Sequence, residues 1–311
     1  MSDAAAGVRR LARAALRIRG VGALTRRIAG LRGRSLVLVY HRLTEGEISG
    51  PQVVPSIPAD LFRRQVEALA GVGRVVPLAD LLAGADRGTP RFALTFDDDY
   101  PSHVVSALPI LRELRLPATF FLSGRSLHGA GPYWFEALER WVRERGLSEV
   151  AVRLEVPADL EAVILACEAD EGLRRVAEEE GRDGVRHLEP GDIGALTDAG
   201  MTIGFHTVDH AVLPRLPDRE LEEAVRAGRE ELAEVVGRPL DLFAYPHGKA
   251  DVRVARKVRE AGYAAAWTGR PRPMHPREDR HLLGRWEPGP LPPDELLVRL
   301  SIRLSRAGRI R

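Results

Sequence analysis

The sequence predicts an α/β fold, with a parallel (β/α) barrel favoured over an open doubly wound sheet. From Ser35 onward, short β-rich runs alternate with amphipathic helical segments, a pattern typical of parallel strands joined by helices. About seven or eight strand candidates follow one another, which suits a barrel. Polar residues end most of these runs. Both architectures place function at strand ends, so this last feature alone does not decide between them.

The first half of the chain supplies four strand candidates and two helices. The runs at 35–41, 74–78, 91–98 and 118–124 are short, apolar and β-rich. Residues 58–73 and 101–115 have apolar residues at the spacing of an amphipathic helix.

The alternation is lost between about Arg125 and Glu189, where charged helical segments predict an insertion or lid. Trp134, Phe135 and Trp141 have helical spacing within it. We therefore expect these aromatic residues to pack the insertion rather than to stack on a ligand.

The second half resumes the alternation. A helix at 191–200 is followed by strand candidates at 201–206, 240–246 and 263–269. Between the first two of these strands a helix is expected from Asp218, a suitable N-cap, to Val236, with Gly237 at its carboxyl end.

The composition indicates a globular chain without a nucleic-acid partner. Hydrophobic residues make up 44% and charged residues 29% of the sequence, and the formal net charge is only +2. The single cysteine, Cys167, excludes internal disulfides and fits a reducing compartment. No apolar run approaches the length of a membrane span, and no secretory signal is evident. A cytoplasmic location is therefore expected.

Residues 1–34 are expected to form a basic amphipathic extension, separate from the barrel domain at 35–311. Leu11, Ala15 and Ile18 share one helical face, opposite several arginines. Such a helix can lie on an anionic membrane surface, here the inner face of the membrane, or it can dock on the domain.

Three consecutive carboxylates, Asp97, Asp98 and Asp99, end the strand candidate at 91–98. Like charges this close raise one another's pKa, so their assembly points to a bound cation or to a proton that must be moved. His206 and His210 stand four residues apart after another strand. Two imidazoles and one carboxylate form a recurring ligand set for catalytic zinc, with positions left open for water and substrate.

The sequence resembles the polysaccharide deacetylase family, also known as the NodB homology domain or carbohydrate esterase family 4. The resemblance rests on four motifs in the family's order, "LTFDDDY", "FHTVDH", "FAYPHG" and "AAWTG". It implies a distorted seven-stranded (β/α) barrel that uses a divalent metal to remove N-acetyl groups from a sugar. By position, Asp97 would be the general base, and Asp98, His206 and His210 the ligands. Zinc is the expected metal, although cobalt, nickel or manganese would also suit these ligands.

The third motif departs from the family pattern. Many relatives have an arginine where this chain has Ala244, a form similar to a "FAYP" subgroup. Arg285, at the end of a late strand-like run, is a candidate replacement, and a surface ion pair is the alternative. The substrate or oxyanion region is assigned to the strand-end residues Tyr245, Pro246, His247, Trp267 and Arg285, with Trp267 as a candidate for lining the acetyl or sugar pocket. The His247 backbone N–H is the candidate oxyanion donor.

The family's general acid, a late histidine, has no match in its usual position. The family's Leu-x-x-His spacing occurs at Leu38 to His41, at the end of the first strand. In this respect the chain resembles the permuted biofilm poly-N-acetylglucosamine deacetylases, so His41 is the expected general acid. His275 and His281 are weaker candidates, and His41 as a simple strand-end residue is the alternative. His103 is interpreted as a polar residue at a helix start, and Asp99 has no assigned role.

The expected substrate is an N-acetylated glycan, reached from the cytoplasm in a lipid-linked, nucleotide-linked or growing form. Two other functions are considered. An Asp-x-Asp glycosyltransferase would use Asp97 to Asp99 for a metal-bound nucleotide, but it gives His206 and His210 no role. A carbohydrate-binding barrel without catalysis would keep the fold and bind metal without hydrolysis.

Overall fold

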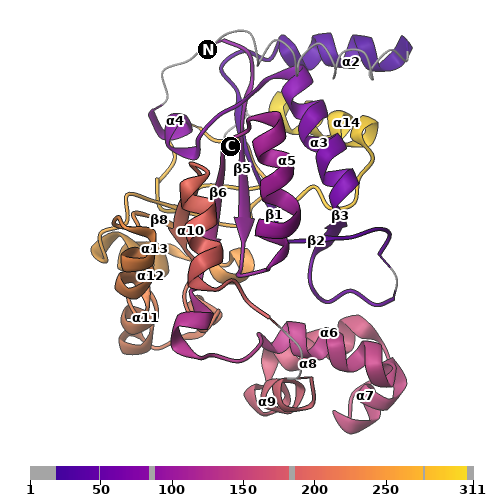
Figure 1. Ribbon diagram of the computed structural model, residues 1–311, viewed down its shortest axis with the longest axis vertical. Helices are drawn as coiled ribbons and strands as arrows, with labels where there is room; N and C mark the ends of the chain where they lie inside the picture. Colours follow the sequence, from indigo (N-terminus) through magenta and orange to yellow (C-terminus); the bar gives the residue numbers. More distant parts are fainter. Residues whose placement is uncertain (1–18, 49, 84–87, 182–185, 276, 307–311) are drawn as a thin grey trace.

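A parallel sheet forms the centre of the molecule. The computed structural model describes residues 19–48, 50–83, 88–181, 186–275 and 277–306. Among these, a seven-stranded sheet has the order β1-β5-β6-β7-β8-β9, with β4 paired to β5, and all pairs are parallel (Figure 1). The strands are β1 (Ser35–Tyr40), β4 (Arg74–Val75), β5 (Arg91–Asp97), β6 (Ala118–Leu122), β7 (Thr202–Phe205), β8 (Leu242–Ala244) and β9 (Ala265–Trp267). The strand predicted at 74–78 stops early because Leu78 begins a helix, α4 (Leu78–Ala83).

A late segment without regular strand structure connects the two edges of this sheet. Leu283 forms a parallel bridge with Trp267 of β9, and Trp286 forms one with Leu38 of β1. Apolar side chains, including Phe121 and Trp267, fill the space that the strands enclose. The predicted distorted (β/α) barrel is therefore confirmed.

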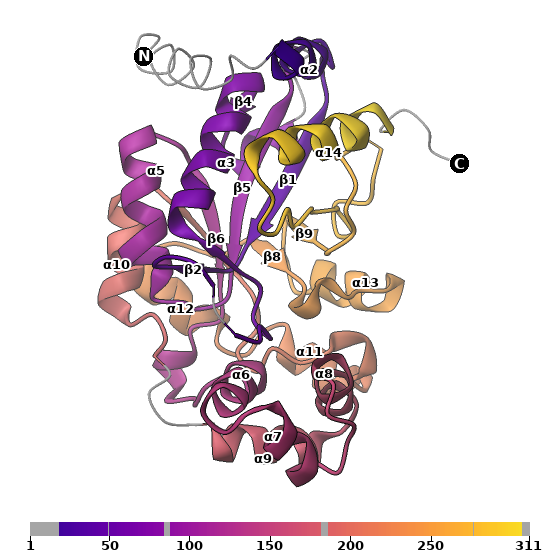
Figure 2. The same cartoon turned by 90° about the vertical axis from the view of Figure 1, so that its right-hand side faces the viewer.

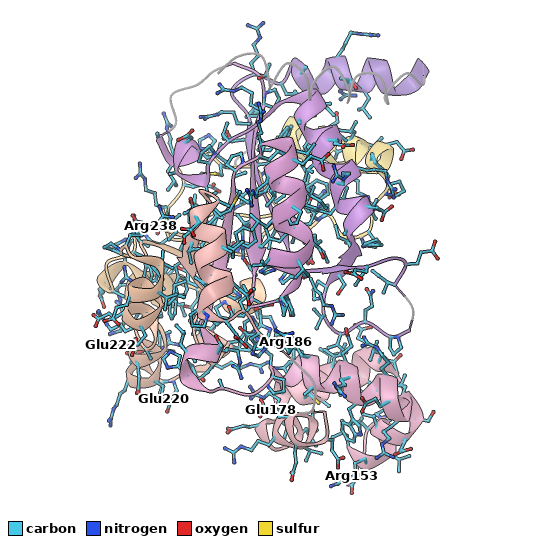
Figure 3. All side chains as sticks on the ribbon, in the orientation of Figure 1. Arg153, Glu178, Arg186, Glu220, Glu222 and Arg238 are labelled. Atoms are coloured by element: carbon cyan, nitrogen blue, oxygen red, sulfur yellow. The ribbon has the colours of Figure 1, made fainter. Side chains whose placement is uncertain are left out.

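Helices cover the outside of the sheet. Phe62 and Leu111 pack in one apolar cluster with outward-facing strand residues such as Phe96. The charged side chains of the outermost helices are exposed, as Glu220 and Glu222 illustrate (Figure 3). The covering helices are α3 (Ala59–Val72), α5 (Leu108–Leu114), α10 (Pro190–Asp198), α11 (Asp218–Ala224), α12 (Arg229–Val236), α13 (Val252–Glu260) and α14 (Pro293–Arg306).

The single helix predicted from Asp218 to Val236 is two helices, α11 and α12. Gly228, with φ of 80°, separates them. A Cβ atom there would lie 2.4 Å from Val208 Cγ2, in the loop that carries the two histidines. Glycine therefore permits a close approach that a longer side chain would prevent. The expected cap at Asp218 is also wrong, because the helix starts at that residue and Pro217 precedes it.

The predicted insertion is a compact group of helices beyond the carboxyl ends of the strands (Figures 1 and 2). It contains α6 (Trp134–Arg145), α7 (Leu147–Arg153), α8 (Leu160–Ala169) and α9 (Glu171–Glu180). These helices share an apolar cluster that is separate from the barrel clusters. Buried Glu139 of α6 accepts hydrogen bonds of 2.9 Å from the N–H groups of Val53 and Val54. The insertion is thereby attached to the loop between the short paired strands β2 (Arg42–Thr44) and β3 (Ser56–Pro58).

The described part of the N-terminal extension is one helix, α2 (Arg19–Ala29), which packs beside α14 (Figure 2). Ile28 is fully buried in this contact, so this helix docks on the barrel. Leu11, Ala15 and Ile18 lie outside the described residues. Within the described ranges, no helix combines the length and apolar character needed to cross a bilayer.

Candidate metal centre and active-site cavity

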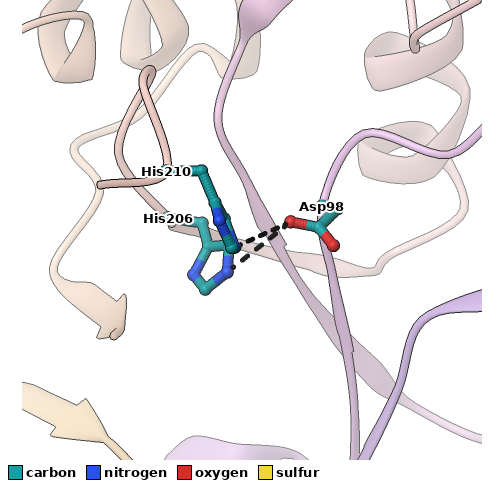
Figure 4. A group of neighbouring side chains, drawn as sticks. All are labelled: Asp98, His206 and His210. Atoms are coloured by element: carbon teal, nitrogen blue, oxygen red, sulfur yellow. Dashed lines mark ion pairs between the residues drawn. The ribbon is translucent and has the colours of Figure 1, made fainter. Parts of the chain in front are cut away.

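The carboxyl ends of β5 and β7 bring three candidate metal ligands together. Asp98 directly follows β5, His206 directly follows β7, and His210 lies in the next loop. Asp98 and His210 have φ of 70° and 50°, values that are unfavourable for residues other than glycine and that cluster at functional sites. The carboxylate and both imidazoles face one another as a result (Figure 4).

The three side chains are close enough to share one cation. Asp98 Oδ1 lies 3.7 Å from His206 Nε2 and 3.4 Å from His210 Nε2. Candidate ligand atoms of all three residues lie within 4.8 Å of one another, and all three residues are buried. This is the ligand set that the sequence predicts.

Their chemistry fits a divalent transition metal. Asp98 Oδ1 is buried without a hydrogen-bond partner among the described residues. His206 Nδ1 lies 2.9 Å from the Ala244 carbonyl oxygen, which can only accept a hydrogen, so the Nε2 lone pair faces Asp98. Burial lowers the pKa of His206 to about 4 and that of His210 well below its usual value, so both rings are neutral. Burial also raises the pKa of Asp98 to about 8, and a bound cation would favour its charged form.

Asp97, the last residue of β5, is held by Arg285. The guanidinium makes two hydrogen bonds to the carboxylate, of 2.5 and 2.6 Å, and both residues are buried. Burial alone would raise the pKa of Asp97, but the Arg285 charge brings it below its ordinary value. Arg285 is therefore a buried partner of Asp97 and does not belong to a surface ion pair. Its guanidinium comes from the segment that connects β9 to β1.

Arg285→Met is expected to reduce the free energy of unfolding by roughly 3–5 kcal/mol, because it leaves a buried carboxylate without its charged partner. Urea unfolding measures this change. Arg299→Met is the matched control, since Arg299 pairs with Glu295 on the exposed face of α14. Equal stability of the two variants would show that the Asp97 pair contributes no more than a surface pair.

His41 follows β1 and lies in the same cavity as Asp97. Its Nδ1 atom is 3.3 Å from Glu287 Oε1. Burial would lower the pKa of His41, but the Glu287 carboxylate more than offsets this effect and raises it to about 9. The imidazole is therefore protonated at neutral pH.

The other candidate histidines lie elsewhere. His281 Nε2 is 2.8 Å from the Tyr263 carbonyl oxygen, away from the cavity. His275 lines a separate depression with Ser35 of β1, at the amino ends of the strands. His103 lies at a helix start, as the sequence predicts, because it is the first residue of the short π-helix His103–Ala107. It is fully buried, and its Nε2 atom lies 3.2 Å from the His41 carbonyl oxygen.

A cavity of about 330 Å³ contains the candidate centre. Barrel loops, the insertion and the late connecting segment all contribute to its walls. The residues that line it are Val39, His41, Val53, Pro55, Asp97, Asp98, Trp134, Phe135, Ile164, Glu168, His206, His210, His247, Gly248, Gly269, Arg285 and Glu287.

The residues of the predicted substrate region differ in whether they reach the cavity. His247 lines the cavity, with its ring 4.5 Å from that of His210. Trp267 does not, because its ring fills the barrel interior against Phe121 and is fully buried. Tyr245 is also fully buried, and its hydroxyl donates to a backbone carbonyl at 2.6 Å. Pro246 is buried beside it and is absent from the cavity wall.

Asp99 has a role that the sequence did not suggest. Its two oxygens accept hydrogen bonds of 2.8 Å from the backbone N–H groups of Ser123 and Arg125. With Asp97 paired to Arg285, only Asp98 among the three carboxylates is left free for a cation. This arrangement does not fit the Asp-x-Asp site of a glycosyltransferase, which would need two carboxylates for its metal.

A buried Asp-His-His set in a cavity at the carboxyl ends of barrel strands has the ligand chemistry of a catalytic metal site. A sequence model described as "Polysaccharide deacetylase" matches residues 84–266. The chain therefore belongs to the polysaccharide deacetylase family and is a carbohydrate N-deacetylase. The matched region contains Asp97, Asp98, His206 and His210, whereas His41 and Arg285 lie outside it. Membership of the "FAYP" subgroup stays a prediction.

Solved structures share this fold. The deacetylase PplD from Streptococcus pyogenes has a TM-score of 0.61 and 15% identity, over 86% of this chain and 98% of its own. IcaB from Ammonifex degensii has a TM-score of 0.60 and 20% identity, over 87% and 97%. A polysaccharide deacetylase from Bacillus cereus has a TM-score of 0.58 and 18% identity, over 86% and 69%. A search of curated protein sequences found no match.

Proposed function

We propose that this deacetylase hydrolyses the N-acetyl group of an amino sugar in a glycan, with a divalent metal held by Asp98, His206 and His210. The observation that carries the proposal is the unpartnered Asp98 Oδ1 facing two neutral imidazoles, beside the Asp97 carboxylate that Arg285 keeps ionised. Zinc is the expected metal, since its usual catalytic sites have three such protein ligands.

The proton transfers of amide hydrolysis can be assigned to groups in the cavity. A divalent cation at the three ligands would polarise the acetyl carbonyl and lower the pKa of a water. Asp97, ionised by its Arg285 pair, accepts a proton from the attacking water as general base. Protonated His41 then donates a proton to the sugar nitrogen as general acid while the C–N bond breaks. Acetate and the free amino sugar are the products.

His247 is proposed to stabilise the negative charge that develops on the acetyl oxygen. Its backbone φ is 56°, and the residue lies at the turn after β8, in the cavity wall. A backbone N–H directed at the developing oxyanion would lower the activation barrier of the hydrolysis, because this donor is already in place before the reaction. Its ring, whose pKa burial lowers to about 4, is neutral and can contact substrate.

The substrate is proposed to be a lipid-linked, nucleotide-linked or growing N-acetylated glycan in the cytoplasm. The acetate bound to the Streptococcus pyogenes deacetylase agrees with acetate as a product. Peripheral membrane contact through the N-terminal extension is a separate proposal, supported by the exposed Arg26 and Arg27 of α2. Because α2 and the insertion lie at opposite ends of the molecule (Figure 1), such contact would anchor the enzyme rather than present a substrate to the cavity.

The proposal is tested by removing and restoring the metal. Protein treated with a chelator and dialysed is expected to release no acetate from N-acetylated oligosaccharides, including β-1,4- and β-1,6-linked N-acetylglucosamine pentamers. Adding about one equivalent of zinc or cobalt per chain should restore release. Metal content is measured by plasma mass spectrometry and acetate by a coupled assay.

Two other outcomes would decide against the proposal. Protein that binds one metal tightly and releases no acetate from any N-acetylated glycan would be a carbohydrate-binding barrel without catalysis. Full activity after complete metal removal would contradict the metal-dependent mechanism.

A further inference from the structure

The insertion supplies part of the cavity wall. Trp134 and Phe135, in the first turn of α6, line the cavity from this side. The Phe135 ring lies 5.1 Å from that of His210, a candidate metal ligand. Among the described residues that line the cavity, Trp134 and Phe135 alone have a tryptophan, phenylalanine or tyrosine side chain. Trp267 does not reach the cavity, because it is buried inside the barrel.

Arg125 joins the start of α6 to the loop that carries the two histidines. Its guanidinium donates to the Gly131 carbonyl oxygen at 2.6 and 2.9 Å, just before α6, and to the Val208 carbonyl oxygen at 2.8 Å. It also lies 4.3 Å above the Tyr133 ring centre. In the sequence, Val208 lies between the candidate ligands His206 and His210. One buried cation thus fixes the aromatic wall relative to the candidate metal centre.

Asp99 fixes Arg125 in turn. One carboxylate oxygen accepts a hydrogen bond from the backbone N–H of Arg125, and the other accepts one from the backbone N–H of Ser123. The Ser123 hydroxyl is 2.6 Å from the hydroxyl of Tyr133, the residue that precedes α6. A continuous set of hydrogen bonds therefore runs from the end of β5, beside the catalytic aspartate, to the first residues of the insertion.

We propose that Trp134 and Phe135 form the apolar wall on which the sugar ring of the substrate binds, and that Asp99 and Arg125 are positioning residues for this wall. The inference rests on the proposed function and adds the part of the chain that recognises the sugar. A pyranose ring presents an apolar C–H face, and ligand pockets bind such faces with aromatic side chains while a few polar groups set the orientation. In this chain the barrel provides the polar groups and the insertion provides the aromatic face.

Trp134→Leu and Trp141→Leu form a matched pair for the test. Both replace an indole of α6 in the same apolar cluster, but only Trp134 lines the cavity. With the oligosaccharide that wild-type protein deacetylates fastest, Trp134→Leu is expected to raise KM roughly tenfold. Trp141→Leu should leave KM unchanged, and Trp134→Phe, which keeps a flat ring, should recover most of the affinity. Metal content should be that of the wild type in all three variants.

Asp99→Asn tests the positioning residues. The amide replaces one acceptor by an NH₂ group that faces a backbone N–H, so one of the two hydrogen bonds is lost. KM is expected to rise several-fold, with a smaller change in kcat and no loss of metal. If Asp99→Asn does not fold, Arg125→Lys replaces it, because one ammonium cannot reproduce the set of guanidinium contacts.

The outcomes separate this inference from the function on which it rests. An active wild type whose KM is unchanged by Trp134→Leu would overturn the sugar-binding wall and leave the deacetylase intact. Unchanged KM in the folded positioning variant would overturn the roles of Asp99 and Arg125. A wild type that releases no acetate from any glycan would overturn the proposed function, and this inference with it.

Discussion

Asp97→Asn is expected to retain its metal and to lose activity by about 10²–10⁴-fold in kcat, the usual contribution of a general base. An amide cannot accept the proton of the attacking water, although it has nearly the same shape as the carboxylate. Asp97 lies 3.8 Å from His206 Nε2, beside the candidate ligands, but its oxygens are engaged by Arg285. Its replacement should therefore remove a proton acceptor without opening the metal site. Steady-state kinetics with metal analysis of the same samples measures both effects.

Asp218→Asn is a suitable control, because Asp218 pairs with Arg253 at the surface. It should match the wild type in kcat and in metal content. Loss of metal from Asp97→Asn would make Asp97 a ligand, and near wild-type kcat would place the general base elsewhere. Either result would require a different assignment of the carboxylates that end β5.

Sequence reasoning identified the candidate ligands because their signal is local. Three aspartates stand at the end of an apolar run, and His206 and His210 have a fixed spacing after another. The choice of Asp98 as the ligand among the three came from the family resemblance. In a parallel barrel, carboxyl ends of neighbouring strands meet at one end, so residues far apart in sequence become neighbours. Fold and site therefore follow from the same alternation of strands and helices.

The partners of these residues were harder to find. The sequence leaves two roles open for Arg285, because nothing in its local sequence distinguishes a buried partner of Asp97 from a member of a surface ion pair. Glu287, which contacts His41, was missed altogether. Both come from the segment that follows β9 in the chain and lies beside β1 in space. This segment is joined to the sheet by isolated bridges and has no strand pattern of its own. Its placement is a property of the closed barrel.

Residue type misled the interpretation of the aromatic residues. Trp267 ends a strand near the site, but a strand directs alternate side chains to opposite faces, and this one points into the barrel. Trp134 and Phe135 have the helical spacing of packing residues and do belong to the apolar cluster of the insertion. They also face the cavity, because the insertion lies over the carboxyl ends of the strands. Periodicity identifies a buried face without indicating what covers it.

His206→Ala is expected to remove the metal and to reduce activity by roughly 10³-fold, the effect of losing several kcal/mol of transition-state stabilisation. The imidazole supplies one of three proposed ligands, and the methyl group of alanine cannot coordinate a metal. Metal analysis after dialysis should give about one equivalent for the wild type and little for the variant.

The change in thermal stability on adding zinc gives a second measure that does not depend on activity. A ligand that binds only the folded state raises the melting temperature, so zinc should stabilise chelated wild-type protein and leave His206→Ala unchanged. His275→Ala is the control, since His275 lies at the amino ends of the strands and should leave the response to zinc intact. If His206→Ala still binds zinc with the wild-type increase in melting temperature, the metal is held elsewhere. The unpartnered Asp98 oxygen would then need another explanation.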